Sequence, residues 1–286
     1  FNKGMSGVSQ GFRDGQIINS ANPASYSAVD SLTALFDFGL SVYNGNYKMG
    51  NLQHNAKNSS FDYAAFHFRA AKGLGIALGI LPYSNINYDF TSNNKIMEGV
   101  EENISSSYSF NGNGGLHKVF LGAGWQITEP LSIGFNLSYL YGSYNHNMSM
   151  SFNESSINSI NRKYNADINS YLLDFGIQYT INTNQTDKLV LGATFSPGHN
   201  INDNAYRTTQ SVNSLSGIIS QTSDTISNAF ELPHTFLIGA TYYKENRLSI
   251  GADFEFQNWS KVKFPIQNTE SNNNYVSQNG LLYDRY

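Results

Sequence analysis

Near the start of the chain, the stretch GVSQG (Gly7 to Gly11) matches the G-x-S-x-G pattern that surrounds the nucleophilic serine of many hydrolases. In those enzymes the serine lies on a sharp turn between a strand and a helix, which exposes its hydroxyl. Here only six residues precede the pattern, and no helical periodicity follows it. We therefore interpret the stretch as a flexible, glycine-rich segment and not as a nucleophile.

The other residue types that perform catalysis or bind metals lack the required spacing. None of the six histidines lies two or four positions from another, the spacing that places two ligands on one face of a strand or helix. The chain has no cysteine, so disulfides and thiolate metal sites are excluded. We expect no enzyme, no metal and no cofactor.

The composition of the 286 residues is that of a membrane β-barrel. Only 13% of the residues are charged, roughly half the usual share, yet the mean hydropathy is −0.37. Barrels combine these properties because half of each strand faces lipid and half faces a polar lumen. The net charge is −4 and the chain has no run of Lys or Arg, so no basic surface is expected that would attract the phosphates of nucleic acid. The longest apolar run, within 73–81, is too short for a membrane helix.

Period-2 alternation of apolar residues predicts nine half-buried strands, and a tenth is expected to begin within GLLYDRY at 280–286. A soluble β-sandwich also alternates, but its strands are usually shorter. A closed bacterial barrel needs an even number of strands, so we expect the sequence to be incomplete at its C-terminus. The nine strands are predicted at 31–43, 59–70, 73–88, 116–127, 131–142, 170–181, 188–196, 233–243 and 247–259.

The connections alternate between short and long, which is the layout of an outer-membrane barrel with periplasmic turns and extracellular loops. The predicted turns are 71–73, 128–130, 182–187 and 244–247, and the predicted long loops are 44–58, 91–115, 145–169 and 197–231. Aromatic residues near the strand ends are candidates for interfacial girdles. They are Tyr43, Trp125, Tyr141, Tyr144, Tyr242, Tyr243 and Trp259.

The first thirty residues do not alternate and are too polar to span a membrane. We predict that residues 1–30 form a hatch inside a barrel of residues 31–286. The hatch residues singled out are Phe12, Ile17, Ile18, Asn22, Pro23 and Ala24.

Three stretches resemble the FadL/TodX (OmpP1) family of outer-membrane transporters. INSANPASYSAVDS is similar to the Asn-Pro-Ala element that ends the family's hatch, and GGLHKVFLGAGWQITEPLSIGFNLSYLYG is similar to its central hairpin. ELPHTFLIGATYYKENRLSIGADFEFQNWSKV is similar to a further hairpin, ending in an Asn-Trp-Ser element. Within this family, the three stretches resemble those of members from Bacteroidota. The resemblance implies a 14-stranded barrel with a hatch that imports hydrophobic molecules such as long-chain fatty acids.

The alternating strand positions that are expected to face the lumen hold both charged and apolar residues. The carboxylates of Asp37, Asp174, Asp253 and Glu255 are typical of a polar lumen that holds a plug, with acid–base catalysis as the alternative. The apolar residues are candidates for lining a path for a hydrophobic ligand, and packing against the hatch explains them equally well. They are Leu35, Leu81, Leu116, Phe120, Leu140, Leu172, Val190 and Leu237.

Pro82 interrupts the third predicted strand, in which Gly73, Gly75 and Gly79 leave one face nearly bare. Proline donates no ladder hydrogen bond, so a bulge or kink beside Gly79 is expected. In the family that the chain resembles, a kinked third strand opens a lateral exit in the barrel wall. The alternative is that Pro82 lies at the extracellular rim, where a missing donor matters little.

These observations favour a passive outer-membrane transporter for hydrophobic small molecules, surrounded by outer-membrane lipid and lipopolysaccharide. The alternative is a non-transporting partner barrel that binds another outer-membrane protein in a secretion or uptake complex. A diffusion pore for polar solutes and an outer-membrane enzyme are weaker alternatives.

Overall fold

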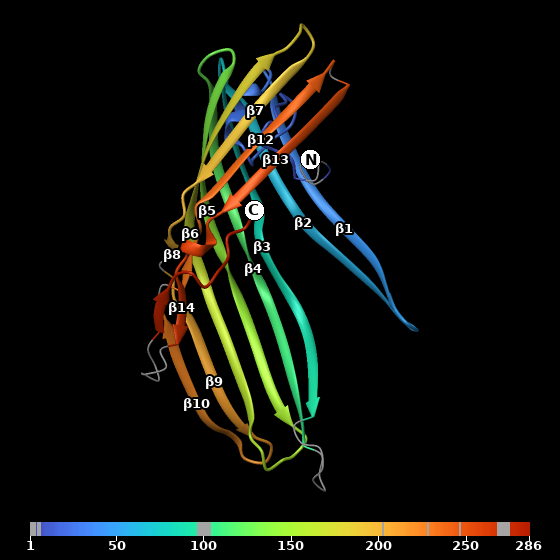
Figure 1. Cartoon of the computed structure of the whole chain (residues 1–286), viewed down its shortest axis with the longest axis vertical. Helices are drawn as coiled ribbons and strands as arrows, with labels where there is room; N and C mark the ends of the chain where they lie inside the picture. Colours follow the sequence, from blue (N-terminus) through green and yellow to red (C-terminus); the bar gives the residue numbers. More distant parts are fainter. Residues whose placement is uncertain are drawn as a thin grey trace.

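The computed structural model describes residues 4, 7–95, 104–201, 203–227, 229–245, 247–267 and 275–286. Nine strands of this region form the main path of one curved 11-stranded antiparallel sheet, in which each strand pairs with the next along the path (Figure 1). The nine predicted strands are therefore all present. They are β1 (Ala34–Met49), β2 (Leu52–Ala71), β3 (Leu74–Lys95), β4 (Ser105–Gln126), β5 (Leu131–Phe152), β6 (Ser159–Asn182), β7 (Lys188–Ser196), β12 (Thr235–Lys244) and β13 (Leu248–Gln257).

The predicted long loops are mostly strand, which corrects the sequence prediction. The β1–β2 hairpin turns at Gly50 and Asn51, β3 continues to Lys95, and β5 and β6 are separated only by residues 153–158. In Figure 1 these hairpins extend downward, away from the short turns at the top. These segments are rich in Ser and Asn, and aromatic or apolar side chains recur on one face only over short stretches, so the alternation was too weak to mark them as strands.

The region between β7 and β12 adds a hairpin and a short strand pair that encloses it. β8 (Asn200–Ile201) pairs with β11 (Phe230–Glu231). Between them β9 (Ala205–Asn213) pairs with both β10 (Gly217–Ile226) and residues 159–166 of β6. Near the C-terminus β14 (Phe264–Gln267) pairs with β15 (Tyr275–Gln278). Within the stretch where a tenth strand is expected to begin, residues 279–282 bend the chain. Arg285 then forms an antiparallel bridge with Gln257 at the end of β13, through two backbone hydrogen bonds of 2.9 Å and 3.1 Å.

Side chains of the sheet alternate between two faces. On β4, Val119 and Leu121 are 43% and 56% exposed on the outside, whereas Phe120 between them is 2% exposed. The outer faces of the other strands are equally apolar, with Phe135, Tyr179, Leu191, Ile238 and Ile250 all exposed. A continuous apolar exterior around a mostly polar interior is typical of a barrel in lipid. Among the residues that the structure describes, no helix is long and apolar enough to cross a membrane.

The N-terminal segment lies inside the curve of the sheet. Its 3-10 helix η2 (Pro23–Ala28) contacts β3, β4, β5 and β6. In Figure 1 this segment is the dark blue chain near the short-turn end. It therefore occupies the position predicted for a hatch.

Inward glycines on five consecutive strands make room for this segment. Because glycine has no Cβ, the hatch backbone lies directly against the sheet. A Cβ at any of these glycines would overlap atoms of the hatch. At Gly124, Gly134 and Gly176 the overlap is with Pro23 and its neighbours Asn22, Ala24 and Ser27. At Gly75 it is with Tyr26, and at Gly192 with Gln10. The bare face of β3 is thus part of the seat of the hatch.

Replacing Gly134 with valine is expected to displace the hatch, because the branched side chain would need the space of the Pro23 and Ala24 backbone. Such overpacking costs about 1–3 kcal/mol. The melting temperature of the folded barrel, followed by heat-dependent gel migration, should fall, and trypsin should cleave after Arg13 more readily. The matched control is Ala123→Val on the outer face of β4, where a larger side chain meets lipid. Equal melting temperatures for the two variants would contradict the prediction.

Candidate functional site

The hatch is tied to the sheet by hydrogen bonds between buried polar groups. Asn22 Oδ1 accepts the backbone N–H of Ala24 at 3.1 Å and thereby caps η2, while its Nδ2 donates to the carbonyl of Gln10 at 3.0 Å. Gln178 on β6 donates to the same carbonyl at 2.8 Å. Asp253 on β13 accepts the N–H of Gln10 at 2.9 Å. Two distant strands therefore hold one stretch of hatch backbone.

Tyr26 anchors the other end of the hatch. It is fully buried, and its hydroxyl donates to Asn136 Oδ1 on β5 at 3.1 Å. Burial raises the pKa of the Tyr26 phenol, so this group stays a neutral donor. The carbonyl of Tyr26 lies 3.0 Å from His67 Nε2 on β2. The structure thus uses His67 to hold the hatch.

Each of the four inward carboxylates has a polar partner of its own. Asp253 binds the hatch, as described above. Asp37 accepts the hydroxyl of Tyr63 at 3.0 Å, and Asp174 lies 3.8 Å from Lys118. Glu255 accepts from Gln257 Nε2 at 2.5 Å. These contacts tie each carboxylate to a polar group of the wall or of the hatch.

Six of the eight predicted lumen residues lie in three separate apolar clusters. Phe120 and Leu81 share one cluster with Tyr26 and Ile18 of the hatch. Val190 contacts Phe12 and Ile17 of the hatch. Leu116, Leu140 and Leu172 form the third cluster with Ile201, and Leu35 and Leu237 belong to none of these clusters. A role of these residues in ligand binding stays a prediction, because the hatch and β8 already contact most of them.

The third cluster is formed by a segment that the sequence analysis treated as a loop. Ile201 on β8, 2% exposed, and Phe230 on β11 point against Leu140, which is fully buried. Apolar residues within the otherwise polar stretch 197–231 were the only signal of this insertion.

Two tyrosines predicted for the interfacial girdle face the interior instead. Tyr243 is 9% exposed and lies against Phe12, with 6.3 Å between the ring centroids. Tyr144 contacts Phe230 edge-on, with 5.3 Å between the centroids. Neighbouring residues on a strand point to opposite faces, so Tyr242 and Tyr243 cannot both face lipid.

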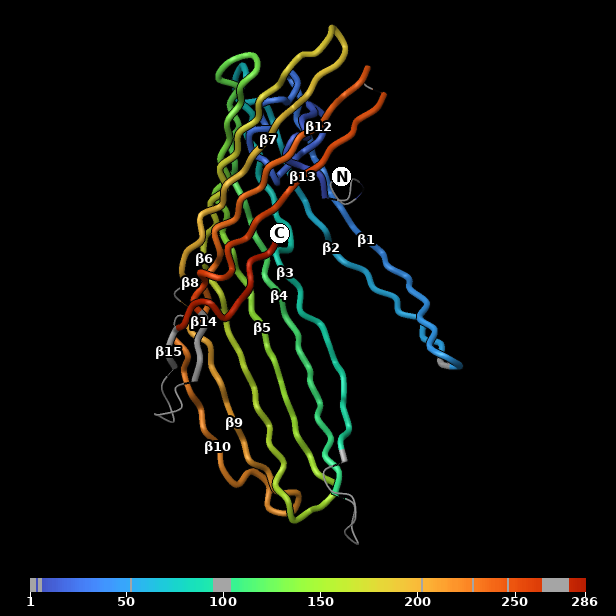
Figure 2. Tube along the Cα trace, viewed as in Figure 1, coloured from blue at the N-terminus to red at the C-terminus, as the bar shows by residue number. Residues whose placement is uncertain are grey.

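The wall of the barrel is interrupted between β2 and β3. Their pairing ends at Ala64 and Ile80, and beyond this point the β1–β2 hairpin departs from β3 (Figure 2). An apolar cavity of about 730 Å³, here called the lateral groove, lies at the interruption. It is lined by residues of both faces, among them Ala64, Leu78, Ile80, Phe120, Leu121 and Tyr139. The groove therefore reaches from the lipid-facing surface to the residue that contacts the hatch.

Gly79 and Pro82 both lie at this interruption. A Cβ on Gly79 would lie 2.8 Å from the Phe120 ring and 2.6 Å from the carbonyl oxygen of Ala64. The register between β3 and β4 shifts between Pro82 and Ser84, so the chain bulges at Tyr83. Their role in a lateral exit stays a prediction.

Beyond the groove, the inner face of the sheet carries a ladder of aromatic rings. Tyr88 and Phe90 on β3 continue into Phe110 on β4, with centroid separations of 5.8 Å and 5.0 Å. His146 on β5 stacks on Tyr88 at 5.9 Å, and Met148 pairs with Phe110 across the strands. This adaptable apolar surface is the part of the predicted long loops that faces the lumen.

The fold is similar to two solved structures of outer-membrane transport proteins. With the crystal structure of the Ralstonia pickettii toluene transporter TbuX, the TM-score is 0.58 at 16% identity, covering 96% of this chain and 78% of that chain. With the CymD monoaromatic hydrocarbon channel, the TM-score is 0.62 at 13% identity, covering 99% and 76%. The predicted fold class, a FadL/TodX-like β-barrel with an internal N-terminal segment, is confirmed.

The family assignment is more specific than the fold. No curated protein sequence matches the chain. A family model described as BamG matches residues 1–282, and neither it nor the two solved structures indicates an enzyme. Because this match covers nearly the whole sequence, the chain belongs to the BamG family.

Proposed function

We propose that the protein is an outer-membrane barrel that works as a partner subunit of BAM, the machinery that assembles other outer-membrane β-barrels. The single observation that carries this proposal is the BamG family match over residues 1–282, because the family's name links it to that machinery. In this reading residues 1–30 are the hatch, residues 31–286 are the barrel, and the short turns face the periplasm.

The interior of the barrel supports a structural role over free transport. The hatch backbone is seated on glycines and held by buried amide and carboxylate groups. The buried side chains of Leu140 and Val190 contact β8 and the hatch respectively. Opening a passage would break these contacts and leave buried polar groups unpaired, at about 1–3 kcal/mol each.

Co-purification tests the partner role. An affinity tag inserted at 214–216, the tip of the β9–β10 hairpin, leaves the sheet intact. Mild detergent extraction of native outer membranes should recover the tagged protein together with the central BAM barrel in comparable amounts. The control is another abundant barrel carrying the same tag. Recovery of the protein alone, after cross-linking before extraction, would contradict the proposal.

A second candidate function is the passage of hydrophobic small molecules, with long-chain fatty acids as the substrates that the sequence suggested. It is supported by the lateral groove and the aromatic ladder, both of which offer apolar surface. The proteins with similar structures carry names that refer to toluene and monoaromatic hydrocarbons. In this reading a compound captured at the ladder leaves the barrel between β2 and β3, beside Gly79 and Pro82.

Filling the lateral groove separates the two candidate functions. Ala64→Trp places an indole in the groove, whereas the control Ala193→Trp adds the same side chain to the outer face of β7. If the protein is a channel, Ala64→Trp should reduce uptake of radiolabelled toluene and oleate by about ten-fold, since the exit is blocked. Equal uptake by both variants and the wild type would exclude exit through the groove.

A further inference from the structure

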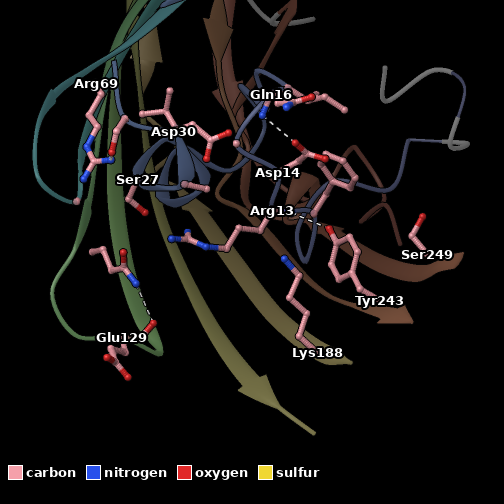
Figure 3. A pocket seen from close by; sticks show the side chains of 18 of the residues that line it. Arg13, Asp14, Gln16, Ser27, Asp30, Arg69, Glu129, Lys188, Tyr243 and Ser249 are labelled. Carbon is pink, nitrogen blue, oxygen red and sulfur yellow. Dashed lines mark hydrogen bonds between the residues drawn. The ribbon is translucent and has the colours of Figure 1, made fainter. Parts of the chain in front are cut away.

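A second cavity opens at the short-turn end of the barrel, beneath the hatch (Figure 3). Its volume is about 1150 Å³. The walls are formed by hatch residues 12–17 and 27–31, by the turns that follow β2 and β4, and by the first residues of β7 and β13. We call it the mouth cavity.

The charge of the mouth cavity is opposite to that of the chain. The whole sequence has a net charge of −4, but five cationic side chains line the cavity against three carboxylates. The cations are Arg13, Arg69, Lys72, Lys188 and Arg247, and the carboxylates are Asp14, Asp30 and Glu129. Among the described residues no salt bridge joins any of these eight groups to another. The excess positive charge is therefore not neutralised by the walls.

Arg13 shows this lack of neutralisation most clearly, and Lys188 lies close to it, with the Asp14 carboxylate as a neighbour. The Arg13 guanidinium donates only to neutral acceptors, the carbonyl of Ala24 at 3.2 Å and Gln178 Oε1 at 3.3 Å. Burial lowers the pKa of Arg13 to about 10, which still leaves the group charged at neutral pH. Lys188 Nζ lies 4.8 Å from the centroid of the Tyr243 ring. A partly buried pair of cations of this kind is stabilised when an anion binds between them.

We propose that the mouth cavity binds an acidic peptide segment of a periplasmic partner protein, with Arg13 and Lys188 at its inner end and Lys72 and Arg247 at its rim. This inference rests on the proposed function as a partner barrel, and it names the chemistry of the contact. A single inorganic anion is too small to reach cations on the hatch, the β2–β3 turn and the β12–β13 turn together. A lipid fits poorly, because the lining is mainly polar and the cavity opens beneath the hatch and not on the apolar outer face.

The probe for this site is fluorescein-labelled hexaglutamate, titrated with the purified full-length barrel in neutral detergent at low salt and followed by fluorescence anisotropy. The wild type should bind it. The double variant Lys72→Gln/Lys188→Gln should bind about ten-fold more weakly, because each lysine contributes a partly screened charge contact. Among the described residues neither lysine forms a salt bridge. Heat-dependent gel migration checks that the variant, which also loses the contact of Lys188 with the Tyr243 ring, is folded.

The matched control is Lys57→Gln/Lys163→Gln, which removes two lysines from β2 and β6, outside the cavity. It should bind hexaglutamate as the wild type does. Equal weakening of hexaglutamate binding in both double variants would overturn the proposal. Displacement of hexaglutamate by inorganic phosphate, added so that both supply the same concentration of negative charges, would also overturn it. Dependence of phosphatidylglycerol binding, but not hexaglutamate binding, on Lys72 and Lys188 would assign the cavity to lipid and also overturn it.

This assay needs only the purified barrel. Failure of hexaglutamate to bind would therefore count against the mouth cavity alone. Failure of the tagged protein to co-purify with BAM would count against the proposed function.

Discussion

The direct contact between the hatch backbone and the inner face of the sheet is the constraint on which the rest of the structure depends. Five consecutive strands place glycine where the hatch crosses them, so no side chains separate the two. Backbone polar groups brought that close to the wall need partners, because an unpaired buried group costs about 1–3 kcal/mol. Asn22, Gln178 and Asp253 supply them. Buried amides are therefore frequent in a chain with few charges.

Because the hatch covers much of the inner face, the apolar and charged surfaces that stay accessible lie at the ends and at the side of the barrel. The inward apolar residues contact the hatch or β8, so the open apolar surface is the lateral groove and the aromatic ladder. The open charged surface is the mouth cavity below the hatch. The surfaces left open by the internal N-terminal segment are therefore the two ends of the sheet and the lateral groove.

At the interruption between β2 and β3, a few residues of β3 coincide with the separation of the whole β1–β2 hairpin from the wall. Gly79 lets the Phe120 ring approach the strand, and the bulge at Tyr83 turns β3 just after its last pair with β2. Pro82, which lies between these two features, has no backbone N–H to offer either neighbouring strand. The β1–β2 hairpin then continues as an isolated pair, which exposes apolar surface at the wall.

Alternation alone was enough to predict nine strands, their order and their lipid-facing residues, because a period of two assigns each side chain to a face. The Asn-Pro element likewise identified the hatch. The strand extensions at 91–115 and 145–169 were missed because they are mostly Ser and Asn, and their few apolar side chains alternate only over short stretches. Alternation assigns a side chain to the inner or outer face, but it does not predict which residues of distant strands that side chain contacts across the lumen. The contacts of Leu140 with β8, and the meeting of Arg13 with Lys72, Lys188 and Arg247, arise only when the curved sheet brings distant turns to one end.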